Sequence, residues 1–139
     1  MFKRILVPTD FSEKSKHAFD IALNIARMGE GKVVLLHVIE MIADSTFEEF
    51  ESFYTRLEHK AESSMNAWIK AHPSGADFVE KEIIYGNRAL EIVKFSEDHE
   101  MDLIVLNSHK INVEDPGGGW GTISYKVSIL ADCPVMLVK

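Results

Sequence analysis

One segment in the last third of the chain carries residues suited to binding phosphate. An apolar run ends at Asn107, and a glycine run at 117–119 then leads to Gly121, Thr122 and Ser124. A glycine-rich segment that enters a helix offers free backbone N–H groups and the positive end of a helix dipole. The glycine run is either a phosphate cradle or a flexible linker that needs positive φ. Thr122 also suits the N-cap of the helix that follows.

A second segment with suitable chemistry lies near the start of the chain. Pro8, Thr9 and Asp10 directly follow another apolar run. Asp10 suits two roles: it can hold ribose hydroxyls or a phosphate-bound Mg²⁺, or it can simply favour the start of the next helix. Its place after a strand favours the ligand-binding role.

Hydrophobic periodicity predicts alternating strands and helices throughout the chain. Short apolar runs predict strands at 3–7, 33–39, 78–85, 102–106 and 134–138. Amphipathic stripes predict helices capped by Ser12, by Ser45 or Thr46, by Asn87, and near Gly121. The stripe that contains Phe47, Phe50, Tyr54, Leu57, Ala61, Met65 and Trp68 is assigned to core packing.

This alternation predicts one α/β domain over residues 1–139, built on an open five-stranded parallel sheet with helices on both faces. Ligands of such sheets bind beyond the carboxyl ends of the strands, where the strand order reverses. Asp10, Val38 and Asn107 all fall at predicted strand ends. We therefore expect these segments to converge on one site.

Composition excludes several classes of function. The formal net charge of −7 argues against a general nucleic-acid or anionic-membrane binder. A single cysteine, Cys133, precludes an intramolecular disulfide framework and is typical of a cytoplasmic protein. No apolar stretch approaches the length of a membrane helix. The chain has no P-loop, no G-x-S-x-G elbow and no H-E-x-x-H metal motif, so no catalytic or metal-ligating residues are assigned. His37, within an apolar strand, is interpreted as a satisfied core histidine.

Four segments together resemble the universal stress protein family: KRILVPTDFSEKSKHAFDIALNIA, KVVLLHVIE, DLIVLNSH and GTISYKVSILADCPVMLVK. The resemblance covers essentially the whole chain. It implies strand order 3-2-1-4-5 and the adenine nucleotide alpha hydrolase-like fold. It also implies a homodimer formed through the last strand, residues 134–138, whose apolar edge suits pairing with a second chain.

Many members of that family bind ATP through the pattern G-x2-G-x9-G-[S/T]. In this chain the final Gly121-Thr122 matches, whereas Asn107 and Lys110 stand in place of the first two glycines. Lys110 suits either a phosphate contact or a block to close backbone approach. His109 stands where the family usually has histidine.

The resemblance and the strand-end geometry together predict where an adenine nucleotide binds. Adenine is expected near Val38 and Leu106, with Asp10 facing the ribose or a metal and the phosphates near the helix start. The full set of predicted ligand-binding residues is Pro8, Thr9, Asp10, Val38, Leu106, Asn107, His109, Lys110, Gly119, Gly121, Thr122 and Ser124.

Three functions remain open at this point. The first is a cytoplasmic stress-response protein that binds ATP, ADP or AMP, with or without Mg²⁺, without catalysis. The second is a nucleotide-free dimeric interaction protein of the same fold. The third is a slow nucleotide hydrolase.

Overall fold

The computed structural model describes residues 1–42, 44–72, 77–108, 114 and 122–139. Its strands are β1 (Arg4–Pro8), β2 (Lys32–Ile39), β3 (Val79–Tyr85), β4 (Leu103–Asn107) and β5 (Val135–Val138). Its helices are α1 (Glu13–Gly29), the short 3-10 helix η1 (Glu48–Phe50), α2 (Glu51–Lys70), α3 (Arg88–Asp98) and α4 (Ile123–Leu130). The sheet order is β3-β2-β1-β4-β5 and every pairing is parallel, which confirms the predicted topology.

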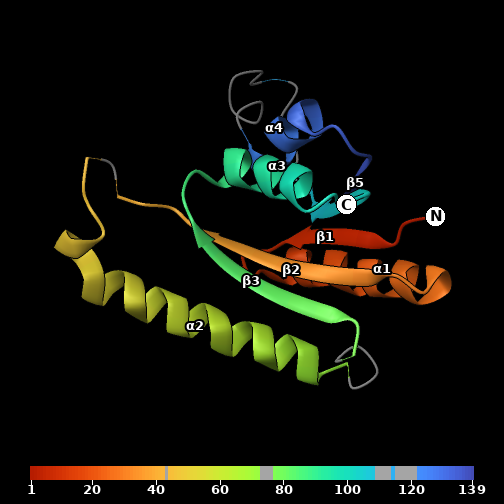
Figure 1. Cartoon of the computed structure of the whole chain (residues 1–139), viewed down its shortest axis with the longest axis horizontal. Helices are drawn as coiled ribbons and strands as arrows, with labels where there is room; N and C mark the ends of the chain where they lie inside the picture. Colours follow the sequence, from red (N-terminus) through yellow and green to blue (C-terminus); the bar gives the residue numbers. More distant parts are fainter. Residues whose placement is uncertain (43, 73–76, 109–113, 115–121) are drawn as a thin grey trace.

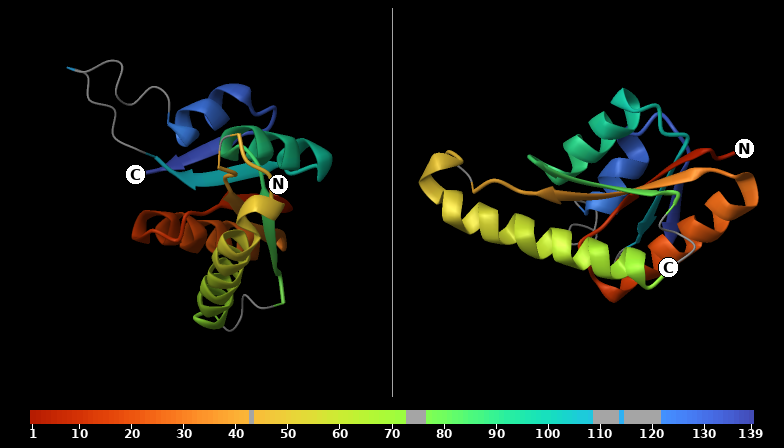
Figure 2. Two further views of the ribbon diagram at one scale, coloured as in Figure 1. Left: turned by 90° about the vertical axis from the view of Figure 1, so that its left-hand side faces the viewer. Right: turned by 60° about the horizontal axis from the view of Figure 1, so that its bottom comes forward.

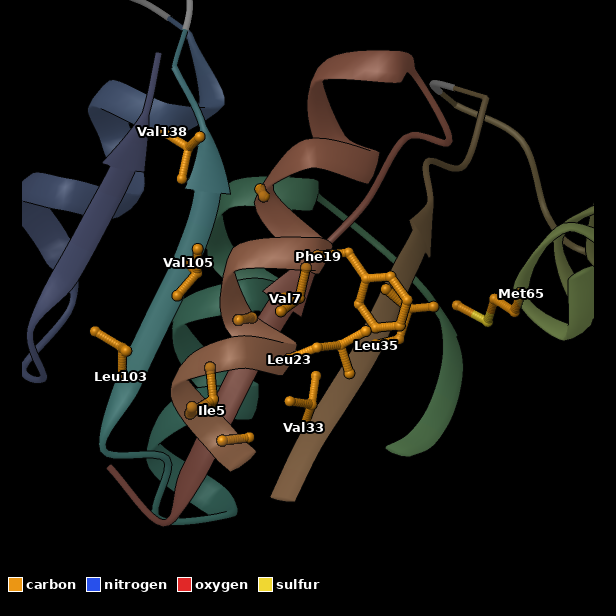
Figure 3. Packing of buried hydrophobic residues seen from close by; sticks show 13 residues of the cluster. Ile5, Val7, Phe19, Leu23, Val33, Leu35, Met65, Leu103, Val105 and Val138 are labelled. Atoms are coloured by element: carbon orange, nitrogen blue, oxygen red, sulfur yellow. The ribbon is translucent and has the colours of Figure 1, made fainter. Parts of the chain in front are cut away.

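Helices cover both faces of this sheet, as predicted, with α3 and α4 on one side and α1 and α2 on the other (Figures 1 and 2). Alternate residues of β2 enter two separate cores. Val33 and Leu35 pack with α1 and Met65 of α2, whereas Leu36 and Val38 pack with α3 and α4. Figure 3 shows the first of these cores, with Phe19 of α1 at its centre. Because both faces of β2 are buried, its sequence reads as a continuous apolar run.

The central strand β1 is tied to β4, almost a hundred residues away in sequence. The carboxylate of Asp102 accepts hydrogen bonds from the backbone N–H of Lys3 (2.8 Å) and of Arg4 (3.1 Å). Beyond these, Ile5 lies opposite Leu103 in the ladder. Pro8 belongs to β1, so the prediction that the strand ends at Val7 is one residue short. Proline fits there because β1 pairs with β4 only at Ile5 and Leu6, while the Thr9 N–H continues the bonds to β2 by donating to the Leu36 carbonyl (2.9 Å).

The helix α1 has well-defined signals at both ends. Ser12 is its N-cap, as predicted, and accepts a hydrogen bond from the Ser15 N–H. The helix ends at Gly29, and its C-cap Glu30 adopts the left-handed conformation with φ of 54°. Gly31 follows, and a Cβ there would lie 2.7 Å from the Phe2 carbonyl oxygen. Close backbone packing against the start of β1 therefore requires glycine at that position.

The start of α2 differs from the prediction. Neither Ser45 nor Thr46 caps it. Instead the chain enters through η1, and Phe50 occupies the N-cap position of α2 without a side-chain hydrogen bond. The core assignment of the α2 stripe is correct for Tyr54, Ala61 and Met65, which are buried. It is wrong for Phe47 and Phe50, which are 38% and 39% exposed, because this end of the helix projects past the sheet (Figure 1).

α3 ends at Asp98, and Cys133 is half-buried. Within the described residues, no helix combines the length and apolar character needed to cross a membrane.

Candidate functional site

A cavity of about 240 Å³ lies at the carboxyl ends of β1, β2 and β4. This is the point at which the order of the sheet reverses, between β1 and β4. Of the predicted ligand-binding residues, the structure brings together Pro8, Thr9, Asp10, Val38, Leu106, Asn107 and Ser124 in its wall.

The other predicted residues are not in that wall. Thr122 is described, but it caps α4 and is not part of the cavity lining. His109, Lys110, Gly119 and Gly121 lie outside the described residues, as does the glycine run at 117–119.

Asp10 is held in place by the turn that joins β1 to α1. Its Oδ1 accepts hydrogen bonds from the Ser12 N–H (2.9 Å) and from the Ser15 hydroxyl (3.0 Å). The Thr9 hydroxyl accepts from the Phe11 N–H (2.9 Å) and lies 3.0 Å from the buried Ser15 hydroxyl. These bonds orient the Asp10 carboxylate before any ligand arrives.

The same bonds decide the charge of Asp10. Partial desolvation acts to raise its pKa, but the hydrogen bonds from Ser12 and Ser15 outweigh this, so the pKa lies below the ordinary value. Asp10 is therefore ionised at neutral pH. A carboxylate of this kind accepts hydrogen bonds from sugar hydroxyls or binds a hard cation.

His37, on the neighbouring strand β2, also supports this turn. Its Nδ1 lies 2.7 Å from the Thr9 carbonyl oxygen, and its ring contacts that of Phe11 with centroids 4.7 Å apart. Burial lowers the pKa of His37, and the nearby Arg88 lowers it further. The prediction of a satisfied histidine is confirmed, although the side chain is half-buried rather than fully enclosed.

The other side of the cavity is formed by the start of α4. Thr122 is its N-cap, as predicted, and its hydroxyl accepts from the Tyr125 N–H (3.4 Å). The Ser124 hydroxyl lies 3.3 Å from that of Thr122, and Ser124 is buried in the cavity wall. A hydroxyl in the first turn of this helix is well placed to donate to an anionic ligand.

Sequence reasoning missed four residues of the wall: Leu36, Arg88, Ile92 and Ile123. Arg88 is the first residue of α3 and follows the N-cap Asn87. Its position in the sequence could have identified it. A helix that follows a parallel strand begins at the edge of the sheet where the carboxyl ends of the other strands also lie. Arg88 brings a fixed positive charge to a cavity that already holds the Asp10 carboxylate.

The cavity therefore combines apolar walls with a few polar groups at its rim. Leu36, Val38, Ile92 and Leu106 form surfaces suited to a flat apolar ring, while Asp10, Arg88 and Ser124 offer a carboxylate, a guanidinium and a hydroxyl. Among the described residues, no group of three or more His, Cys, Asp or Glu side chains is arranged to hold a metal ion.

Comparison with known proteins agrees with this geometry. The family model of the universal stress protein family matches residues 1–139. Universal stress protein MJ0577 of Methanocaldococcus jannaschii is 32% identical over 158 residues, which cover 100% of this chain and 96% of the relative. The solved structure of MJ0577 superposes with a TM-score of 0.81.

Two further solved structures extend the comparison. Universal stress protein UspA from Lactobacillus plantarum is 26% identical, with a TM-score of 0.79 and coverage of 99% of this chain and 98% of that one. A universal stress protein from Archaeoglobus fulgidus, solved in complex with dAMP, covers 100% of this chain and 98% of its own. It has a TM-score of 0.70 at 15% identity, a likeness that concerns the fold alone. The strand order, the site at the switch point and the full-length match lead to one conclusion: this chain belongs to the universal stress protein family.

Proposed function

We propose that the protein binds an adenine nucleotide in the cavity at the carboxyl ends of β1, β2 and β4, and acts as a non-catalytic regulator of the stress response in the cytoplasm. The observation that carries the proposal is the convergence of Asp10, Val38, Leu106 and Ser124, from four separate segments, on one cavity. Membership of the family supports it, as does the dAMP complex of the Archaeoglobus fulgidus relative.

The residues present fit the parts of a nucleotide. Val38 and Leu106 offer apolar surface for adenine, and the ionised Asp10 offers an acceptor for the ribose hydroxyls. The cavity of about 240 Å³ lies below the range of about 300–1,000 Å³ that is usual for ligand pockets. The nucleoside is therefore the part that fits inside, and the phosphates extend towards Ser124 and the first turn of α4.

Asn107 is the feature that weighs against this proposal. It is half-buried in the cavity wall, at the position where the ATP pattern of the family has glycine. A side chain there occupies space that glycine leaves open to a phosphate. The nucleotide-free dimer is the competing function.

The first experiment separates the two. The purified protein is denatured, released adenine nucleotide is measured by chromatography, and ATP and AMP are titrated with and without Mg²⁺ by calorimetry. We expect binding, and we expect Asp10→Asn to weaken it roughly tenfold through loss of a charged hydrogen bond. Asp132→Asn is the matched control, because Asp132 is exposed and distant from the cavity lining. No bound nucleotide and no heat at millimolar ATP would favour the nucleotide-free dimer.

The third possibility, slow hydrolysis, is tested separately. Steady-state phosphate release from ATP is measured for the wild type and for Asp10→Ala. Turnover that disappears in the variant would overturn the non-catalytic part of the proposal.

We also propose that the protein forms a homodimer through β5. This strand is an edge of the sheet, with Met136 37% exposed, and the neighbouring α4 exposes Ile129 and Leu130 by 66% and 48%. An apolar edge of this kind favours pairing with a second copy. Light scattering should give a dimer that Met136→Lys weakens. Met28→Lys, at an exposed methionine of α1, should leave the dimer intact, and a wild-type monomer at micromolar concentration would contradict the proposal.

A further inference from the structure

A second and larger cavity, of about 770 Å³, lies between the end of β2 and the N-terminal half of α2. It is on the opposite face of the sheet from the first cavity, because His37 and Ile39 line it whereas Leu36 and Val38 line the other. The two cavities share only Asp10 and Arg88 in their walls.

Small side chains on α2 keep this cavity open. Ala61 and Ser64 face it from the middle of the helix, and the larger Leu57 remains half-buried. Tyr54 holds the loop after β2 against the helix, because its hydroxyl accepts a hydrogen bond from the Ile42 N–H (2.6 Å). The space is a groove open to solvent, because Glu40, Ile42, Phe53 and Lys60 in its wall are exposed, so a ligand can reach it directly.

The walls are suited to an aromatic group. Phe11 and His37 form a pair of rings with centroids 4.7 Å apart on one side. Phe53 faces the space from α2 and is 40% exposed. A flat apolar ring bound here would cover the exposed ring of Phe53 and gain the burial energy of its own surface.

Two positively charged side chains in the wall of this cavity differ in their ion pairing from other lysines near the same face of the sheet. Lys32 and Lys81 each pair with a carboxylate, Glu80 at 3.9 Å and Glu62 at 3.1 Å respectively. Lys60 and Arg88 form no ion pair with any residue in the described part of the chain. Of the acidic residues in the wall, Asp10 already accepts two hydrogen bonds, and Glu40 is exposed.

We propose that this cavity is a second ligand site, for a small aromatic carboxylate whose ring packs between Phe11 and Phe53 and whose negative group meets Lys60 and Arg88. A monoanion fits better than a phosphate dianion, because Asp10 and Glu40 also line the space and repel additional negative charge. The site lies on the other face of the sheet from the first cavity, but the two share Asp10 and Arg88, so a nucleotide and the carboxylate would compete for Arg88.

The test uses 2-naphthoate as the probe, titrated by calorimetry into nucleotide-free full-length protein, beside 2-naphthylmethylammonium, a cation of similar size with the same ring. We expect one naphthoate per chain, bound at least about tenfold more tightly than the cation, which is the effect of one charged hydrogen bond. Equal affinities would overturn the assignment of Lys60 and Arg88.

Substitutions at two neighbouring serines test where naphthoate binds. Ser64→Phe fills the cavity and should abolish naphthoate binding, whereas Ser63→Phe, on the exposed side of α2, should leave it unchanged. Naphthoate binding that survives Ser64→Phe but is displaced by AMP would place the probe in the first cavity and overturn the proposal.

A second pair remains informative if Ser64→Phe fails to fold by circular dichroism. Lys60→Met removes the charge but keeps the length of the side chain, and it should weaken naphthoate binding roughly tenfold. Lys70→Met, in the last turn of the same helix, should have no effect. Equal affinities of the two methionine variants would refute the site.

Discussion

The helices α1 and α2 pack on the same face of the sheet but are buried to different extents. α1 lies against the central strands, and six of its 17 residues are buried: Ser15, Ala18, Phe19, Ala22, Leu23 and Ala26. α2 has 20 residues and packs on the outer strands β2 and β3, and only Tyr54, Ala61 and Met65 are buried. A helix over the middle of a sheet is enclosed by its neighbours, whereas a helix over the edge leaves room between itself and the sheet.

The ends of the two helices differ in the same way. α1 begins at the Ser12 cap, in the hydrogen-bonded turn that also fixes Asp10. α2 begins without a side-chain cap, beside the second cavity. The start of α1 is therefore fixed by the same hydrogen bonds that orient Asp10 in the first cavity, whereas the start of α2 has no such side-chain bond.

The largest expected effect tests the difference in burial. Phe19→Ala should lower the free energy of unfolding by about 3–5 kcal/mol, because it removes a fully buried ring from the first core. Leu57→Ala should cost about 1 kcal/mol, because Leu57 is only half-buried and borders the second cavity. Urea denaturation followed by circular dichroism measures both, and similar losses for the two variants would contradict the comparison.

A smaller effect is expected where α2 is fastened. Tyr54→Phe should cost about 1–2 kcal/mol, because the Ile42 N–H loses its acceptor while the ring packing is kept. Amide hydrogen exchange should increase locally at Ile42. Unchanged exchange there would show that the hydrogen bond does not hold the loop.

The caps should differ by less. Ser12→Ala should destabilise the protein by about 1 kcal/mol, the usual cost of losing an N-cap hydrogen bond. Ser52→Ala, in the exposed first turn of α2, should be close to neutral because Ser52 is not a cap. The melting temperatures of the two variants are measured. Equal values would contradict the difference between the capped start of α1 and the uncapped start of α2.

The smallest expected effect is a loss of stability at alkaline pH, caused by a tyrosine that bonds to α2. Burial and the hydrogen bond to Glu58 (2.6 Å) raise the pKa of Tyr85 from 10.0 to about 12. Above pH 10 the unfolded chain loses the Tyr85 proton first, so this contribution to stability is complete below pH 10 and is lost between pH 10 and 12. Denaturation at pH 9 and 11 should show a larger drop for the wild type than for Tyr85→Phe. An identical drop would argue against the Tyr85–Glu58 bond.

Local patterns were sufficient to predict much of the molecule from its sequence. Continuous apolar runs identified the doubly covered strands, and short-range chemistry identified the caps Ser12, Asn87 and Thr122. The strand order itself came from the family resemblance, since alternation alone does not specify which strands are neighbours. Strand-end reasoning then placed Asp10, Val38 and Leu106 in one cavity.

What could not be predicted depends on distance in space. Arg88 lines the first cavity because α3 begins, after β3, at the edge of the sheet where the strands end, and the residue itself belongs to no motif that indicates this. The aromatic residues Phe47 and Phe50 continue the helical stripe of α2, yet they extend past the sheet and stay exposed. Periodicity predicts which side of a helix is apolar, but it does not predict how far the supporting sheet reaches.

The central position of β1 has a consequence for the order of events during synthesis. When the first hundred residues have left the ribosome, β1 can pair with β2 and β2 with β3, but β4 and the Asp102 carboxylate that binds the Lys3 and Arg4 amides are not yet available. The nascent chain therefore carries an apolar, open strand edge at the centre of its future core, the kind of surface that misassembles or recruits chaperones.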